Sequence, residues 1–349
     1  MRQFLKQLFS FSLVGIVLLL LIVIGYFYFD PFQVLYKHKD YSTSNFVECD
    51  RDFISTETYL NKKDIYNYNS FMFGSSRTMA YKPDTWKKYL SKEAKVFAYD
   101  ATMESIYGIY KKVKFLDSTH ANIKNALFIF CRDYTFATTE NPENHILKKH
   151  PLLSGESKFD FQYTFFKSYF DINFLISYYT RLFTGEHFPF MNEYVNELKV
   201  AFHPISNHLM LVDAERMIRE NPNKYYSKYK QKFYCKKDGK GILIQKIIIA
   251  KDETISENRI DKEMEKMLQE IHQILIKHNT KYLIILQPLL EKVKYSDVDY
   301  KILNSIFGNH IYDFTGKNKF TVSINNYYDW SHFRPKVGDE IFKEIYQSK

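Results

Sequence analysis

Short runs of apolar residues, separated by stretches with helical periodicity, limit the folds open to this chain most strongly. Five such runs predict strands, and they are Ser70–Phe73, Lys95–Tyr99, Ala126–Cys131, Lys281–Leu286 and the shorter Ile311–Asp313. Runs of this length without polar alternation are typical of strands buried on both faces. Such strands belong to parallel sheets, whose faces are covered by helices.

The segments between these runs predict helices. Their apolar residues recur at helical spacing or follow a helix-starting proline, and the ranges are Lys82–Ser91, Ser105–Leu116, Ile260–Lys277 and Pro335–Tyr346. In Ile260–Lys277 the apolar stripe contains Met264, Leu268 and Ile271. Strands that alternate with helices predict a three-layer α/β domain of flavodoxin-like layout around a central parallel sheet.

Two regions depart from this alternation. Residues 30–69 have no clear periodicity, and we expect an irregular lead-in there. Residues from about 135 to 241 are rich in aromatic side chains, with Phe159–Phe183 helical in parts and Tyr225–Lys237 strongly basic. We expect a mostly helical insertion that covers the sheet. Its tyrosine- and lysine-rich face could bind a sugar polymer or an acidic head group, or it could simply be solvated.

The amino terminus predicts a single membrane span. Residues 7–29 contain no charged side chain and are long enough to cross a bilayer. Arg2 and Lys6 precede the apolar stretch, so the positive-inside rule leaves residues 1–6 in the cytoplasm and residues 30–349 outside. The alternatives are a buried core helix and a cleaved signal peptide. We expect a single-pass protein of the bacterial inner (cytoplasmic) membrane, with the bilayer as one of its partners.

Charge and cysteine content exclude several classes of protein. A net charge of +9 makes anionic partners plausible, but the lysines are scattered and no nucleic-acid-binding motif is present. The three cysteines have neither zinc-ligand spacing nor a disulfide framework. Phosphate-binding loops and metalloprotease motifs are also absent from the sequence. We therefore expect no metal, no cofactor and no nucleic-acid partner.

Two polar motifs at opposite ends of the domain suggest serine chemistry. Gly74-Ser75-Ser76 follows the first predicted strand, at the edge of an α/β sheet where ligands usually bind. Alone, it is more often a turn with a helix N-cap. Near the other end of the chain, Asp329 and His332 stand three residues apart before the last helix. A serine hydroxyl becomes nucleophilic when a base takes its proton and a carboxylate orients that base.

These motifs resemble the SGNH/GDSL hydrolase superfamily, which has its nucleophilic serine in the first block and an Asp-x-x-His pair in the last. The layout is most similar to that of membrane-anchored envelope members, such as the teichoic-acid D-alanyl-transfer and alginate-type acetyltransferase proteins. The resemblance implies that Ser76 is the nucleophile, His332 the general base and acid, and Asp329 its orienting partner. Ser75 occupies the aspartate position of the family's first block and is the competing nucleophile.

Two residues of the family's oxyanion hole have no counterpart in this sequence. The resemblance implies a glycine after the second strand, where Ala101 and Thr102 stand, and an asparagine after the third, where Arg132 and Asp133 stand. Backbone N–H groups near Ala101 and Thr102 could replace the glycine. Arg132 or Arg77 could supply the side-chain donor.

Two functions from different classes remain open. The first is an acyltransferase or esterase that carries an acyl group on Ser76 and acts on a cell-envelope or exported polysaccharide. Its partners would be an acylated donor or a membrane acyl-transfer protein, and a glycan acceptor. The second is a catalytically weak or inactive scaffold of the same fold that binds an envelope polymer or such a membrane partner.

Overall fold

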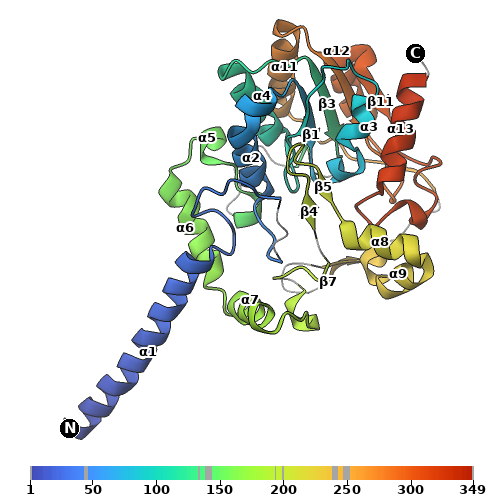
Figure 1. Cartoon of the computed structure of the whole chain (residues 1–349). Helices are drawn as coiled ribbons and strands as arrows, with labels where there is room; N and C mark the ends of the chain where they lie inside the picture. Colours follow the sequence, from blue (N-terminus) through green and yellow to red (C-terminus); the bar gives the residue numbers. More distant parts are fainter. Residues whose placement is uncertain are drawn as a thin grey trace.

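A five-stranded parallel sheet forms the centre of the molecule (Figure 1). The computed structural model describes residues 2–42, 46–132, 134–137, 144–192, 194–198, 200–237, 243–246 and 252–347. The strands of the sheet are β1 (Ser70–Gly74), β2 (Val96–Ala98), β3 (Asn125–Phe130), β9 (Lys281–Leu286) and β11 (Ile311–Asp313). Their spatial order is β11-β9-β3-β1-β2, and every pairing is parallel. Counted along the chain, this order is 2-1-3-4-5, as in doubly wound flavodoxin-like sheets. The five predicted strands are confirmed.

Helices cover both faces of the sheet, so the domain has the three predicted layers. The helices whose buried side chains join the first face are α2 (Arg51–Tyr66), α4 (Ile106–Ser118), α11 (Lys262–Lys277) and α12 (Asp297–Phe307). The opposite face is covered by α3 (Pro83–Lys87) and α13 (Pro335–Gln347). In Figure 1, α13 stands on the other side of the strands from α4 and α11.

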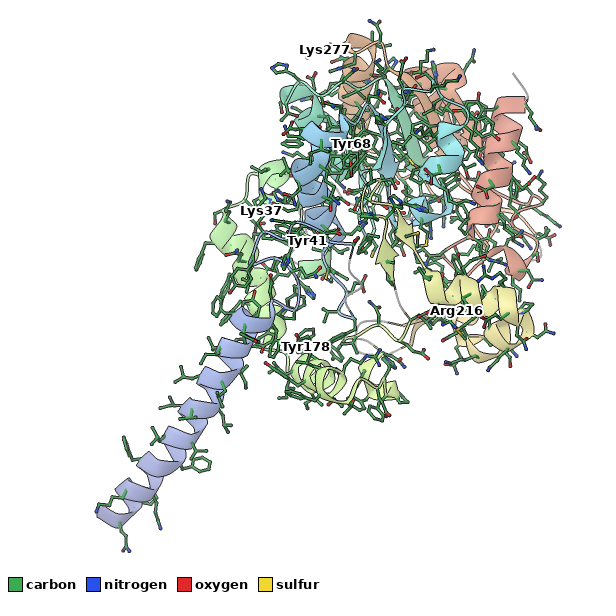
Figure 2. The ribbon with its side chains drawn as sticks, viewed as in Figure 1. Lys37, Tyr41, Tyr68, Tyr178, Arg216 and Lys277 are labelled. Atoms are coloured by element: carbon green, nitrogen blue, oxygen red, sulfur yellow. The ribbon has the colours of Figure 1, made fainter. Side chains whose placement is uncertain are left out.

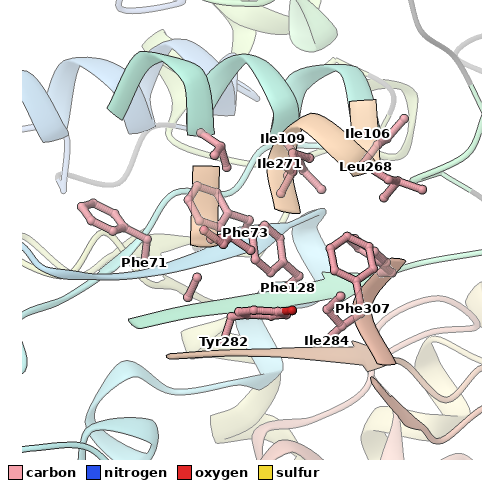
Figure 3. Close-up of a cluster of buried hydrophobic side chains, with 14 of the residues drawn as sticks. Phe71, Phe73, Ile106, Ile109, Phe128, Leu268, Ile271, Tyr282, Ile284 and Phe307 are labelled. Carbon is pink, nitrogen blue, oxygen red and sulfur yellow. The ribbon is translucent and has the colours of Figure 1, made fainter. Parts of the chain in front are cut away.

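Alternation along the strands explains the two cores. Phe71 and Phe73 of β1 point to the α4 and α11 side, where Phe73 stacks on Phe128 with ring centres 5.1 Å apart (Figure 3). Met72, between them, belongs to the core under α13. On α11, Leu268 and Ile271 are buried against the sheet, as their helical spacing predicts. Each fully buried side chain of this size contributes about 1.5–3 kcal/mol.

The expectation of an irregular lead-in is wrong for Arg51–Tyr66, which forms α2. Asp50 caps this helix by accepting a hydrogen bond from the Phe53 N–H at 2.9 Å. The helix has no apolar periodicity because much of its buried face is polar, with Arg51, Asp52 and Ser55 all inside the protein. A pattern search that relies on buried apolar residues cannot find such a helix.

Two other helices differ from the expectation. The helix expected over Lys82–Ser91 is shorter, since α3 ends at Lys87 and the next residues form i→i−3 turns. Helix α12 was not predicted, although Ser296 caps it by accepting from the Asp299 N–H at 3.1 Å. The helices predicted over Ser105–Leu116, Ile260–Lys277 and Pro335–Tyr346 are confirmed by α4, α11 and α13.

The amino-terminal helix, α1 (Arg2–Phe29), extends away from the domain (Figure 1). Its stretch Phe11–Phe29 is long and apolar enough to cross a membrane, and only 11% of it is buried within the protein. Asp30 ends the helix, because its carboxylate accepts the N–H groups of Val34 and Leu35 at 3.0–3.2 Å and turns the chain back.

Between β3 and α11 the described chain is mainly helical. Helix α5 (Pro151–Ser154) contacts α4, and α6 (Lys158–Tyr169) and α7 (Ile172–Thr184) lie beside the end of α1. Three more lie nearer the carboxyl-terminal segment, namely α8 (Val212–Glu220), α9 (Pro222–Lys228) and α10 (Gln231–Tyr234). Short pairs of strands complete the described part of the chain, with β4 (Ala201–Phe202) on β5 (Leu209–Met210), β6 (Cys235–Lys237) on β7 (Leu243–Lys246), and β8 (Thr254–Ile255) on β10 (Val293–Lys294).

Candidate active site

The turn after β1 gives its two serines different surroundings. Ser75 is fully buried and caps the short 3₁₀ helix Ser76–Ala80, with its hydroxyl accepting the Arg77 N–H at 3.4 Å. Ser76 is half-buried and lines a large cavity, whereas Ser75 does not. The N-cap interpretation of this turn is therefore right for Ser75. Ser76 is the serine that a ligand in the cavity could reach.

Gly74 allows the turn to pass close to β3. A Cβ at this position would lie 2.7 Å from the Ile129 carbonyl oxygen and 3.0 Å from the Ile129 Cβ. Backbone cannot move aside as a flexible side chain can. The glycine is thus required by the close approach of the two strands at the sheet edge, where Ser76 emerges.

Ser76, His332 and Asp329 form one hydrogen-bonded chain. The Ser76 Oγ lies 2.9 Å from the His332 Nε2, and the His332 Nδ1 lies 2.9 and 3.1 Å from the two carboxylate oxygens of Asp329. Burial alone would raise the pKa of Asp329, but the His332 ring and two backbone N–H groups hold it below its usual value. Asp329 is therefore ionised near neutral pH, as a partner for the Nδ1–H must be.

The segment that carries Asp329 and His332 is a closed loop. Its ends are joined by the bridge between Tyr327 and Phe333, and by the Tyr328 N–H, which donates to the His332 carbonyl at 2.8 Å. The Asp329 Oδ1 also accepts the N–H groups of Ser331 and His332, at 2.7 and 2.9 Å. The carboxylate thus shapes the loop as well as facing the imidazole.

Contacts from α13, α9 and α10 hold this loop opposite Ser76. Gly338 of α13 packs so closely on the Ala80 carbonyl that no side chain fits between them. Tyr225 of α9 donates its hydroxyl to the Tyr328 carbonyl at 2.9 Å, and the Trp330 N–H donates to the Lys232 carbonyl at 3.1 Å. The region between β3 and β9 therefore helps to position the histidine.

Arg77 connects three parts of the site and does not line the cavity. Its Nε donates to the Ser331 carbonyl at 2.7 Å, and its Nη1 donates to the Cys131 Sγ at the end of β3. Its guanidinium also lies 5.2 Å from the ring centre of Tyr134. The sequence predicts that Arg77 lines the site, but its observed contacts are those of a residue that fixes the histidine loop to the nucleophile turn.

Backbone amides are the best candidates for an oxyanion hole. The Ala101 N–H donates to the Gly74 carbonyl at 3.2 Å and is therefore engaged in the fold. Ser76 and Thr102 both line the cavity, and within the described residues neither N–H has a hydrogen-bond acceptor. Of the two residues expected after the second strand, Thr102 is thus the one placed to offer a donor.

Arg132, the described candidate after the third strand, does not supply the missing side-chain donor to the cavity. Arg132 is not among the residues that line the cavity, and its Nη2 lies 3.4 Å from the Glu291 carboxylate. Asp133 lies outside the described residues.

The cavity next to Ser76 has a volume of about 1040 Å³ and is bounded by several regions of the chain, including Pro189 and Phe190 after α7. The lead-in supplies Glu48 and Arg51, the helices before β6 supply Tyr229 and Lys228, and the loop around His332 closes another side. A smaller cavity of about 410 Å³ lies behind Met79 and includes neither Ser76 nor His332. Among the described residues, no group of three or more His, Cys, Asp or Glu could hold a metal ion.

Glu48 is an acidic residue of the site that the sequence did not reveal. Its side chain is exposed to the cavity but surrounded by protein, and this burial raises its pKa, against the opposing charge of His332. Glu48 stands in a segment without periodicity or motif. Only its place beside the cavity in the folded chain distinguishes it.

A buried ionic cluster supports the loop that contains Thr102. Asp100, on one side of that loop, pairs with Arg51 at 2.7 Å. Glu104, on the other side, pairs with Lys149 at 2.7 Å and with Lys112. All five side chains are at least 95% buried. Helices α2 and α4 and the segment before α5 are therefore joined at this loop.

Comparison with known proteins adds nothing to this geometry. No protein-family model matches the chain, and no curated protein is significantly similar to it.

Proposed function

We propose that this protein is a membrane-anchored serine acyltransferase or esterase of the SGNH type, acting on a cell-envelope or exported polysaccharide. The observation that carries the proposal is the chain from Ser76 through His332 to Asp329, with hydrogen-bond distances of 2.9 Å at both links. Nucleophile, base and orienting carboxylate occur in the order that ester chemistry requires.

The reaction proceeds in two steps. The Ser76 Oγ attacks the carbonyl carbon of an acyl donor while the His332 Nε2 takes its proton, and the same proton then passes to the departing oxygen of the donor. An ester on Ser76 results. In the second step His332 takes a proton from an acceptor hydroxyl, which attacks the carbonyl carbon of that ester, and then gives the proton to the departing Ser76 Oγ. A sugar hydroxyl as acceptor gives transfer, and water gives hydrolysis.

The amides of Ser76 and Thr102 would stabilise the oxyanion of both steps. Neither N–H has another acceptor within the described residues, and both residues line the same cavity. Loss of one oxyanion donor typically costs about 10²–10³ in rate. A site with only two backbone donors is therefore expected to be a slow enzyme in comparison with one that has three.

The cavity suits a sugar-containing acceptor. Its volume of about 1040 Å³ is at the upper end for small-molecule sites. Its lining includes the half-buried ring of Trp330 and the exposed side chains of Lys228 and Lys232. Aromatic faces pack on the apolar faces of sugar rings, while ammonium groups attract anionic substituents.

Helix α1 would anchor the domain on the outer side of the bacterial inner membrane. The charges of Arg2 and Lys6 precede the apolar stretch Phe11–Phe29 and favour a cytoplasmic amino terminus. The acyl donor would then be a lipid-borne or protein-borne group at that surface.

Labelling with a fluorophosphonate tests the proposal directly. We expect the full-length protein to be modified, with the adduct located on Ser76 by peptide mass spectrometry, and Ser76→Ala to be unmodified. Ser75→Ala is the matched control and should still be labelled. Absence of labelling on the folded protein would refute the enzyme proposal.

One observation favours the alternative, in which the protein is a catalytically weak or inactive scaffold that binds a polymer or a membrane partner. After β3 the family's asparagine is absent, and Arg132 lies against Glu291 instead of at the cavity. If cells that carry the Ser76→Ala variant and cells that carry the His332→Ala variant both kept full biological activity, the protein would act by binding alone.

A further inference from the structure

Helix α7 carries an apolar stripe that the domain leaves uncovered. Ile172, Ile176, Tyr179 and Phe183 are spaced i, i+4, i+7 and i+11, so they share one face of the helix. Ile172, Ile176 and Phe183 are 65%, 51% and 77% exposed. The opposite face, with Phe174 and Tyr178, packs inside the protein.

Helix α6 repeats the pattern. Phe159, Tyr163, Phe166 and Phe170 follow the same i, i+4, i+7, i+11 spacing. Phe159 and Tyr163 are 75% and 54% exposed, and their rings are stacked 6.2 Å apart. Exposed aromatic and aliphatic side chains on two neighbouring helices are unusual on a surface that faces only water.

Each stripe meets the apolar stretch of α1. The Tyr179 hydroxyl packs directly on Gly25, where a Cβ would meet it, and lies 2.6 Å from the hydroxyl of Tyr169. Tyr169 in turn donates to the Ile22 carbonyl at 3.0 Å. On α6, Phe166 contacts Tyr26 with ring centres 5.3 Å apart.

These contacts fix the position of both helices along the axis of α1. Gly25 and Tyr26 lie within the last turns of the apolar stretch Phe11–Phe29. Figures 1 and 2 show α7 beside the end of α1, with Tyr178 labelled in Figure 2 at that junction. If α1 crosses a bilayer, α6 and α7 lie at the boundary between its head groups and acyl chains.

We propose that α6 and α7 form a membrane-seated platform, with their apolar stripes inserted in the bilayer interface on the side where the domain lies. An apolar helix face binds a bilayer interface in this way, buried about 5–10 Å deep. In α6 and α7 the other face packs inside the protein, so only the exposed stripe is available to the lipid. Lys158 and Lys167 of α6 are exposed, where they could meet lipid phosphates. The occupant of this surface is the lipid bilayer.

The platform continues toward the catalytic cavity. After α7, Phe188 and Phe190 stack with ring centres 6.0 Å apart and are 36% and 55% exposed. Phe190 and its neighbour Pro189 also line the cavity that contains Ser76. Seating of α7 would thus bring one wall of the cavity near the bilayer and within reach of an amphiphile in it.

The proposal rests on α1 spanning the membrane and not on the serine chemistry, so the test separates these points. Three tryptophan variants of the full-length protein, Leu18→Trp, Phe183→Trp and Val322→Trp, are reconstituted in phosphatidylcholine nanodiscs with or without brominated acyl chains. Leu18 reports the span, Phe183 the platform, and the exposed Val322 a surface beside α13. The unmodified protein supplies the background emission of its two native tryptophans.

We expect bromine to remove most of the added emission of Leu18→Trp and Phe183→Trp and to leave that of Val322→Trp unchanged. Quenching of Leu18→Trp without quenching of Phe183→Trp would overturn the platform and leave the anchor standing; a protein partner would then be the occupant of the stripes. Absence of quenching in both would overturn the anchor and the platform together. Ile176→Trp, on the same stripe, serves as reporter if Phe183→Trp does not fold.

Discussion

Replacing Asp329 by asparagine separates the electrostatic role of the carboxylate from its structural role. The Oδ1 that accepts the N–H groups of Ser331 and His332 is retained in asparagine, so the loop keeps its shape. The other oxygen, 2.9 Å from the His332 Nδ1, can become an NH₂ group. An NH₂ group there favours the imidazole tautomer with its proton on Nε2, facing Ser76. That nitrogen can no longer accept the serine proton.

The expected loss is about 10⁴ in rate, by analogy with the same exchange in other serine triads. At about 1.4 kcal/mol per tenfold change, this corresponds to roughly 5.5 kcal/mol of transition-state stabilisation. The assay is the second-order rate of Ser76 labelling by a fluorophosphonate in the full-length protein. Asp313→Asn is the matched control, because among the described residues its exposed carboxylate bonds Thr315 alone and should not affect the rate.

The reasoning fails if Asp329→Asn reacts within about tenfold of the unmodified protein while labelling still requires Ser76. The thermal unfolding midpoints of the two asparagine variants should also agree with that of the unmodified protein. A large drop for Asp329→Asn alone would mean that the carboxylate acts mainly on the loop.

Three further predictions concern stability. Gly74→Ala should destabilise the fold by about 1–3 kcal/mol in denaturant unfolding, because its Cβ meets the β3 backbone; an unchanged midpoint would contradict the close approach. Lys149→Met should cost about 3–5 kcal/mol, because it leaves Glu104 with less counter-charge in the interior, whereas Lys317→Met at an exposed pair should cost under about 1 kcal/mol. Glu48→Gln should raise the unfolding midpoint at neutral pH but not in acid, because the pKa of Glu48 is higher in the folded than in the unfolded protein. The stability that protonated Glu48 contributes below its unfolded-state pKa is lost as the pH rises through its folded-state pKa. An equal change of the midpoint at both pH values would refute the raised pKa of Glu48.

The sequence was informative wherever the structure depends on local patterns. Runs such as Lys281–Leu286 favour buried strands by their length and their β-branched residues, and an amphipathic stripe such as that of α11 indicates both the helix and its inner face. Ser76 and His332 were found by motif, although they are 256 residues apart, because each motif is short and rich in special residue types. Their hydrogen bond also depends on the contacts that hold the His332 loop to Arg77, α9 and α10.

The remainder of the site depends on contacts that leave no pattern. Helix α2 was missed because much of its inner face is polar or ionic, and the partners of its Asp52, Lys112 and Lys149, are distant in sequence. The candidate oxyanion donors are backbone amides, which every residue has, so Thr102 has no distinguishing side chain. Only the engagement of the Ala101 N–H with Gly74 separates the two neighbours.

The two halves of the proposed catalytic site are held by different parts of the molecule. Ser76 is fixed to the sheet by β1 and by the close packing of Gly74 on β3. The loop of His332 is fixed to α9 and α10 through the Tyr225 hydroxyl and the Lys232 carbonyl. Because general-base catalysis requires the serine and imidazole within hydrogen-bond reach, any shift of these helices against the sheet would lengthen the 2.9 Å contact. Helices α9 and α10 are therefore part of the proposed machinery, because their contacts position the general base.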